Sequence, residues 1–236
     1  MPPALRRFGL AAVIVLLGSA LFIWRLGALG QLDETPALFA AAGRAMAETG
    51  DWLTPRVNGH PRFDKPVLIY WLIGGFTALF PASWDPLGSW ASTLPSGLAM
   101  LALMLALGLT VLPRWGPARA LTAALAFALS PLILLWGRVA VSDPLLTACI
   151  GLGLLGLWHR YASPRSGFPW LPWVVLGLGV LTKGPVALVI ALPTLLLFGG
   201  LQRDLGGLIR AVQPLLGMES PQNTARASMR PRLSQN

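Results

Sequence analysis

The stretch GDWLTPRVNGHPRFDKPVLIYW, residues 50–71, combines charged side chains with several prolines and an Asn-Gly pair. Prolines and Asn-Gly pairs interrupt regular helices and mark turns. Apolar segments flank this stretch, and much of the remaining chain is apolar as well. The stretch therefore predicts an irregular, charged connection beside a membrane.

The chain as a whole is too apolar for an ordinary soluble domain. Its 236 residues are 55% hydrophobic and only 11% charged, and the mean hydropathy is +0.65. Soluble domains carry about 25% charged residues, so we expect an all-α polytopic membrane protein. The net charge of +9 does not indicate a nucleic-acid partner, because the Lys and Arg residues lie at the ends of apolar segments.

Six segments of the chain are candidates for membrane spans, since a span needs about 20 apolar residues. Residues 1–24 also resemble a signal peptide, but no clear small-residue cleavage site follows, so we expect a retained first span. A turn at residues 182–185 divides the last long apolar stretch into two short helices. The predicted spans are residues 8–24, 90–112, 118–136 and 144–158 and the two halves of 170–200.

Residues 67–80 form a further apolar segment of about 14 residues, a length that favours an interfacial or re-entrant helix. If this segment does not cross the membrane, four pairs of Arg residues at the ends of the spans lie on one side, which the positive-inside rule makes cytoplasmic. Those residues are Arg6, Arg7, Arg114, Arg119, Arg160, Arg165, Arg203 and Arg210. We therefore predict about six transmembrane helices, cytoplasmic termini and a large outer loop over residues 26–89.

The outer loop is predicted to begin with an amphipathic helix that lies on the membrane. Thr35 is the expected N-cap and Pro36 the first helical residue. The apolar residues that follow at helical spacing are Leu38, Phe39, Ala42 and Met46. With the segment at 67–80, this gives two interfacial helices in the first outer loop.

Several short motifs occur in order along the chain, and together they are more specific than any one alone. They are Asp33-Glu34-Thr35, Gly50-Asp51-Trp52 with Pro55 and Asn58-Gly59, Phe63-Asp64-Lys65-Pro66, Tyr70-Trp71, Leu94-Pro95-Ser96, Ser130-Pro131, Arg138 with Asp143, and Leu181-Thr182-Lys183-Gly184-Pro185. From about residue 25 to residue 201 the chain resembles the family 39-like, phospholipid-carrier-dependent glycosyltransferases. That group includes the bacterial aminoarabinose transferases of lipid A and is similar to the protein O-mannosyltransferases.

The resemblance implies a GT-C membrane fold whose outer loops bind a sugar linked to a polyprenyl phosphate. Asp33 matches the family's candidate base, and Asp143 matches the aspartate of the second outer loop. Glu34, beside Asp33, is a further candidate catalytic carboxylate. Lys65 and Lys183 match lysines associated with the lipid phosphate, and we expect Arg138 to join them.

The chemistry of such a transfer needs residues of these types. A carboxylate accepts the proton of an acceptor hydroxyl, and cations neutralise the phosphate as it leaves. The scheme requires no cofactor, and no metal site is indicated. The expected partners are a polyprenyl-phosphate-linked sugar donor, a lipid or protein acceptor and membrane lipids. We expect a multi-pass protein of the cell membrane with an extracytoplasmic active face.

Each candidate residue also has an interpretation without catalysis. Asp33 and Glu34 stabilise the positive end of a helix dipole, and Lys65 is placed to contact anionic headgroups. Arg138 and Asp143 are candidates for a mutual ion pair. Lys183 is different, because a charge in the middle of about 30 apolar residues indicates a functional site by default.

The family's members are usually longer than this chain. We expect residues 1–217 to form a GT-C-like transmembrane domain that corresponds to the N-terminal part of the family fold. Residues 218–236 are polar and basic without periodicity, which predicts a disordered tail. Three functions stay open: a lipid-linked sugar transferase, a transporter or flippase for polyprenyl phosphates, and an inactive truncated membrane fragment.

Overall fold

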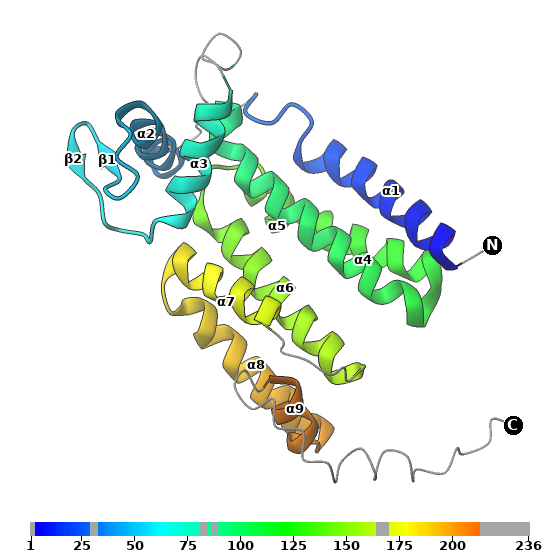
Figure 1. Cartoon of the computed structure of the whole chain (residues 1–236). Helices are drawn as coiled ribbons and strands as arrows, with labels where there is room; N and C mark the ends of the chain where they lie inside the picture. Colours follow the sequence, from blue (N-terminus) through cyan, green and yellow to red (C-terminus); the bar gives the residue numbers. More distant parts are fainter. Residues whose placement is uncertain (1–2, 29–32, 81–84, 86–88, 164–169, 213–236) are drawn as a thin grey trace, which may run out of the picture.

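The computed structural model describes residues 3–28, 33–80, 85, 89–163 and 170–212, and the predicted tail at 218–236 lies outside them (Figure 1). The regular secondary structure of the described chain is helical apart from one short hairpin. Its elements are α1 (Pro3–Phe22), α2 (Glu34–Thr49), β1 (Arg56–Val57), β2 (His60–Pro61), α3 (Leu68–Leu79), α4 (Ser89–Ala128), α5 (Pro131–Trp136), α6 (Ser142–Ala162), α7 (Trp170–Lys183), α8 (Val186–Gln202) and α9 (Leu205–Val212).

The long helices run side by side and form a bundle, with α2, α3 and the hairpin gathered at one end (Figure 1). Among the described residues, three helices are long and apolar enough to cross a membrane, namely Ala4–Phe22 of α1, the whole of α4, and α6. The helices α3, α7 and α8 are apolar but shorter. The chain is thus an all-α polytopic membrane protein, as its composition predicts.

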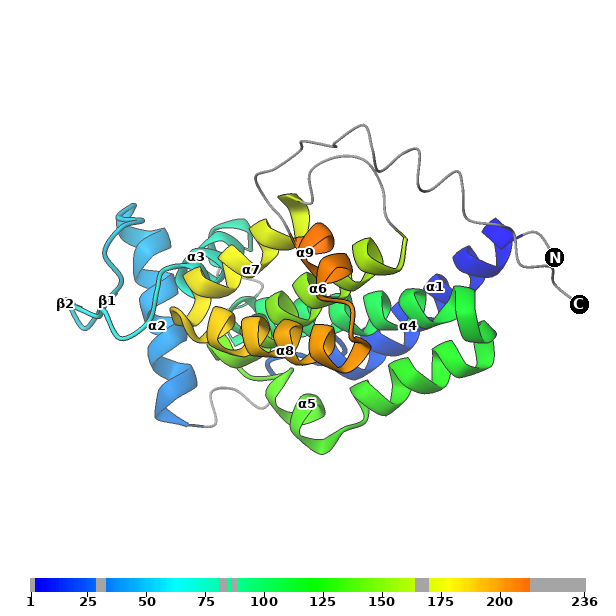
Figure 2. The same cartoon turned by 90° about the horizontal axis from the view of Figure 1, so that it is seen from below.

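Helix α4 is divided by a kink, which separates two of the predicted spans (Figure 2). Gly116 has the non-helical angles φ 79° and ψ 173° and lies between Pro113 and Pro117. Proline lacks the amide hydrogen that a helix interior needs, so the prolines favour a break here. The span predicted at residues 118–136 is interrupted once more, because α4 ends at Ala128 and α5 begins at Pro131.

The predicted division of the last apolar stretch is confirmed. Helix α7 ends at Lys183 and α8 begins at Val186. Between them Gly184 has φ 71°, a left-handed conformation that a residue without Cβ adopts at little cost. The chain reverses direction at this turn and places Lys183 at the tip of a helical hairpin.

Small residues let α1 and α4 approach closely in the bundle. Ile14 of α1 and Met104 of α4 are completely buried. A Cβ atom at Gly108 would overlap Cδ1 of Ile14, so a larger residue there would require the Ile14 side chain to shift. The part of α4 that follows the kink at Gly116 contributes Ala120 and Ala124 to the same core cluster. Close packing of this kind is the main attraction between helices in lipid, where burial from water contributes little.

Two details of the predicted first helix of the outer loop are wrong. The N-cap is Asp33 rather than Thr35, because the Asp33 carboxylate accepts a hydrogen bond of 2.7 Å from the Glu34 amide. The apolar stripe faces protein rather than lipid. Its residues Phe39, Ala42 and Met46 pack against Ile69, Tyr70 and Ile73 of α3 in one buried cluster.

The charged stretch at 50–71 forms a tight connection between α2 and α3. Asn58 and Gly59 have φ values of 51° and 80° and join the antiparallel strands β1 and β2. Two consecutive positive φ values are the signature of a type I′ hairpin turn. The indole nitrogen of Trp71 then donates a 2.6 Å hydrogen bond to the Trp52 carbonyl, which fastens the connection to α3.

Candidate functional site

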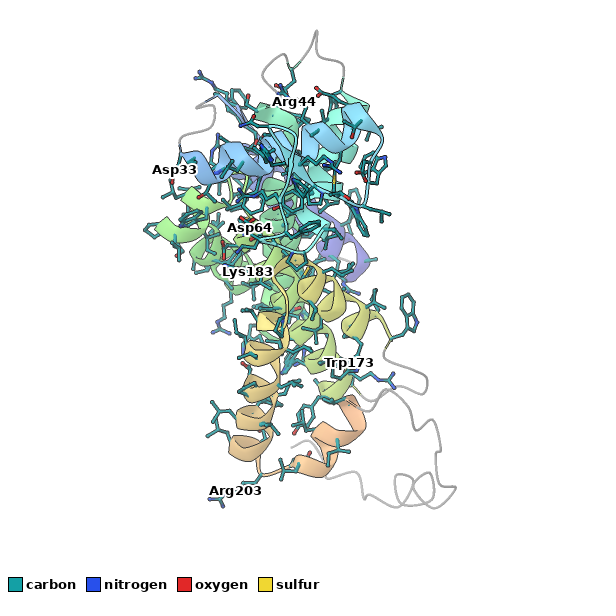
Figure 3. All side chains as sticks on the ribbon, turned by 90° about the vertical axis from the view of Figure 1, so that its left-hand side faces the viewer. Asp33, Arg44, Asp64, Trp173, Lys183 and Arg203 are labelled. Atoms are coloured by element: carbon teal, nitrogen blue, oxygen red, sulfur yellow. The ribbon has the colours of Figure 1, made fainter. Side chains whose placement is uncertain are left out.

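The predicted site residues come from different elements that meet at one end of the molecule. Figure 3 shows Asp33, Asp64 and Lys183 in the upper half of the view, whereas Trp173 and Arg203 lie toward the opposite end. The helices α3 and α7 are in contact at this end. We call this end the loop end; it is formed by α2, the hairpin, α3 and the α7–α8 turn.

An ion pair between Asp143 and Lys183 joins two helix termini at the loop end. The Lys183 Nζ atom lies 2.5 Å from Asp143 Oδ1. Asp143 lies in the first turn of α6 and Lys183 is the last residue of α7. A carboxylate at a helix start and a cation at a helix end are each stabilised by the helix dipole. The two side chains are 51% and 32% exposed, so the pair is accessible to a ligand.

A cavity of about 400 Å³ adjoins the ion pair between α4, α5 and α6. Asp143 is one of its lining residues, and the remaining lining is largely apolar. The other lining residues are Met100, Leu132, Ile133, Trp136, Pro144 and Thr147. A mostly apolar cavity with one polar edge suits a ligand that has a hydrocarbon part and a charged or polar head.

The carboxylates of Asp33 and Glu34 lie at the start of α2. Asp33 is exposed and caps the helix through the hydrogen bond to the Glu34 amide. Glu34 is the first helical residue and is exposed too. The interpretation of Asp33 as a helix-start residue is therefore correct, but a capping carboxylate on an exposed turn is also within reach of a ligand.

Lys65 follows a second ion pair, between Arg62 and Asp64. Arg62 Nη2 lies 2.5 Å from Asp64 Oδ2, and the guanidinium carbon lies 5.9 Å from the centre of the Phe39 ring. These contacts fix the chain just before Lys65, which is half-buried. Among the described carboxylates none forms an ion pair with Lys65. No described carboxylate therefore neutralises its ammonium group.

Arg138 has partners that the sequence did not indicate. Its guanidinium donates hydrogen bonds to the backbone carbonyls of Leu21, Trp24 and Arg25. The suggested ion pair of Arg138 with Asp143 is wrong, since Asp143 pairs with Lys183 instead. No motif pointed to the α1 carbonyls, because such contacts depend on how α1 packs beside the segment between α5 and α6.

The structure thus brings Asp143 and Lys183 into direct contact and places Asp33 and the 62–65 segment at the same end of the molecule. A catalytic or phosphate-binding role of Asp33, Glu34, Lys65, Asp143, Lys183 or Arg138 stays a prediction. In the described ranges, no three His, Cys, Asp or Glu side chains gather in a way that could hold a metal ion.

Residues 64–212 match the profile of the dolichyl-phosphate-mannose-protein mannosyltransferase family. The matched range contains the ion pair, the cavity and Lys65. Asp33 and Glu34 precede it. The match therefore covers the region from α3 to α9 and the motif series from Asp64 onward.

Curated relatives include two arabinosyl transferases of pseudomonads. The chain is 33% identical over 188 residues to the undecaprenyl phosphate-alpha-4-amino-4-deoxy-L-arabinose arabinosyl transferase 1 of Pseudomonas fluorescens, an alignment that covers 72% of this chain and 33% of the relative. It is 35% identical over 173 residues to the corresponding transferase of Pseudomonas aeruginosa, with 70% and 30% covered. The chain thus spans about a third of the length of these relatives.

Solved structures of ArnT from Cupriavidus metallidurans have the same fold. The apo structure superposes with a TM-score of 0.74 at 24% identity, covering 89% of this chain and 39% of that one. The structure bound to undecaprenyl phosphate gives the same TM-score and identity. The bundle and its loop end are therefore the architecture of a known polytopic transferase fold, over a part of its length.

Proposed function

Because the chain belongs to the dolichyl-phosphate-mannose-protein mannosyltransferase family, we propose that it acts as an integral-membrane glycosyltransferase. The proposed donor is a sugar linked to a polyprenyl phosphate, in line with the names of the relatives. The proposed acceptor is a hydroxyl group of a lipid or a protein. The observation that carries the proposal is the Asp143–Lys183 ion pair beside the apolar cavity.

A polyprenyl phosphate has a charged head and a long hydrocarbon tail, and the loop end offers a partner for each. Lys183 supplies an accessible cation, and Lys65 supplies a second one on a segment that the Arg62–Asp64 pair holds in place. The cavity offers an apolar surface next to this charge. We therefore assign the phosphate to Lys65 and Lys183 and the first isoprene units to the cavity.

The reaction assigns a role to each charged group. The acceptor oxygen attacks the anomeric carbon of the sugar, and the bond from that carbon to the phosphate oxygen breaks. The polyprenyl phosphate leaves with the bonding electrons, and Lys65 and Lys183 stabilise its growing negative charge. Asp33 accepts the proton of the acceptor hydroxyl, with Glu34 as the neighbouring alternative. Asp143 holds the Lys183 ammonium in position.

The proposed active face is extracytoplasmic. Arg203 lies toward the opposite end of the bundle (Figure 3), and Arg119 follows the α4 kink, which lies away from α2 and the hairpin (Figure 2). These basic residues support a cytoplasmic position for that end under the positive-inside rule. The loop end then lies at the outer surface, where a donor anchored in the outer leaflet presents its phosphate.

The test is a comparison of donor binding and sugar transfer in the purified chain and three variants. Asp33→Asn keeps its shape but cannot accept a proton, so turnover should fall by about 10²- to 10⁴-fold while donor binding stays nearly intact. Lys183→Ala and Lys65→Ala remove a charge that meets the phosphate before and during reaction, so affinity and rate should fall together. Undecaprenyl phosphate carrying a radiolabelled sugar serves as the donor.

Arg119→Ala is the matched control, since it removes an exposed cation at the opposite end of the bundle. Its binding and turnover should equal those of the parent chain. Normal turnover of Asp33→Asn would contradict the assignment of the base and favour a transporter of polyprenyl phosphates. An unchanged donor affinity in both Lys65→Ala and Lys183→Ala would contradict the assignment of the phosphate to these two lysines.

A further inference from the structure

Arg138 lies on the short segment between α5 and α6 and reaches across to the end of α1. Its Nη1 donates a 2.6 Å hydrogen bond to the Leu21 carbonyl, and its Nη2 donates to the carbonyls of Trp24 at 2.8 Å and Arg25 at 3.4 Å. These residues are separated from Arg138 by more than 110 positions in the sequence. The contact is therefore a long-range connection between two parts of the chain.

The carbonyls that Arg138 binds belong to the last turn of α1 and to the chain that follows it. The last four carbonyls of a helix have no partner within the helix, and they form the negative end of its dipole. The planar guanidinium presents several N–H donors in a fixed arrangement and can satisfy more than one carbonyl at once. The ammonium group of lysine lacks this planar arrangement of donors, so a contact with several carbonyls at once is specific to arginine.

The surroundings of Arg138 are closely packed, which restricts its movement. A Cβ atom at Gly97 of α4 would lie 2.7 Å from the Phe22 carbonyl oxygen, and one at Gly137 would lie 3.0 Å from the Phe22 ring. The Ser96 hydroxyl, which is buried, donates a 3.3 Å hydrogen bond to the Val141 carbonyl. The segment that carries Arg138 is thus held against both α1 and α4.

Arg138 connects two segments of the chain, and a candidate catalytic carboxylate comes after each of them in the sequence. Asp143 comes directly after the Arg138 segment, in the first turn of α6. Asp33 comes after the end of α1, at the start of α2. We propose that Arg138 is a positioning residue, which fixes the start of α2, with Asp33, relative to the start of α6, with Asp143. Its guanidinium acts on the backbone and does not bind the lipid phosphate.

The structural part of this inference does not depend on any activity. In a Cys149→Ala background, which removes the one native cysteine, nitroxide labels are attached at Glu34→Cys and Thr147→Cys. Both positions are exposed, and they report the distance between the starts of α2 and α6. The distance distribution should be narrow with Arg138, broad with Arg138→Ala and intermediate with Arg138→Lys.

Two controls separate this effect from general unfolding. A label pair at Thr147→Cys and Leu178→Cys reports the packing of α6 on α7, which Arg138 does not touch, and its distribution should stay unchanged in every variant. Arg119→Ala removes the same charge elsewhere and should leave both distributions unchanged. An unaltered Glu34–Thr147 distribution in Arg138→Ala would overturn the proposal.

The functional part rests on the proposed transferase activity. Arg138→Ala should lower turnover by up to about 10²-fold, the effect of a displaced catalytic group, and should leave donor affinity close to that of the parent. A loss of donor affinity as large as that of Lys183→Ala would instead make Arg138 a phosphate ligand and overturn the proposal. If the parent chain transfers no sugar, the distance measurement still decides the role of Arg138.

Discussion

Asp143 and Lys183 form their ion pair across 40 positions of sequence. Both residues were predicted as site residues, Lys183 because an isolated charge in an apolar stretch indicates a function and Asp143 from the family resemblance. The pairing itself could not be predicted, because Arg138 is much closer to Asp143 along the chain. Partner choice follows from the packing of α6 against α7, which no local pattern encodes.

Asp51 at the start of the charged connection should make its turn sensitive to pH. Hydrogen bonds from the amides of Thr54 and Leu53, and then the nearby Arg56 guanidinium, lower the pKa of the Asp51 carboxyl below its ordinary value. A depressed pKa means that the charged form stabilises the turn above about pH 4 and that this contribution is lost as the pH falls through the lowered pKa.

Hydrogen exchange at the amides of Leu53 and Thr54, corrected for intrinsic rates, measures this effect. Protection should be present at neutral pH and decline below about pH 4. Asp51→Asn, whose side-chain oxygen still accepts hydrogen bonds but does not titrate in this range, should remove the decline. The same acid-induced loss in Asp51→Asn would show that another group titrates.

At the scale of single elements, helix type was predictable and helix ends were less so. The start of α2 moved from Pro36 to Glu34, because the Asp33 side chain supplies the cap. The break after Ala128 was missed, although Ser130-Pro131 is a helix-start signal. The orientation of α2 was missed for another reason: its apolar stripe is equally suited to lipid and to a neighbouring helix, and α3 covers it.

Gly97 provides a test of the contact between α1 and α4. A Cβ atom there would approach the Phe22 carbonyl oxygen to 2.7 Å, and backbone cannot move aside as a side chain can. Gly97→Ala should therefore destabilise the folded protein by about 1–3 kcal/mol, as overpacking usually does. The midpoint of thermal unfolding in detergent should fall.

Gly177→Ala is the matched control, because no atom lies within 4 Å of the added methyl group. Alanine is the better helix former by about 1 kcal/mol, so the unfolding midpoint should be unchanged or higher. Equal midpoints for Gly97→Ala and Gly177→Ala would show that α1 shifts freely on α4.

For the molecule as a whole, composition and segment lengths predicted the fold class and most of the helices. Solvation in lipid requires long apolar helices, and their lengths are visible in the sequence. The clustering of α2, the hairpin and α3 at one end also agrees with a single outer loop (Figure 1). What the sequence lacked was the long-range contact of Arg138 with α1, which depends on side-by-side packing of distant segments.

The proposed topology places the loop end outside and the kink of α4 inside. His60→Cys and Arg119→Cys, each in the Cys149→Ala background, test it with a maleimide that does not cross membranes. In intact cells the label should react at position 60, which is exposed on the hairpin, and reach position 119 only after permeabilisation. Labelling of both positions in intact cells would show that α3 crosses the bilayer and would refute the six-span topology.

The Asp143–Lys183 pair has an electrical consequence on this topology. A single charge that crosses the membrane gains or loses about 2.3 kcal/mol per 100 mV of transmembrane potential. The carboxylate and the ammonium respond with opposite signs, and they lie next to each other. Their responses therefore cancel, and the junction of α6 and α7 should be insensitive to the voltage of the energised membrane.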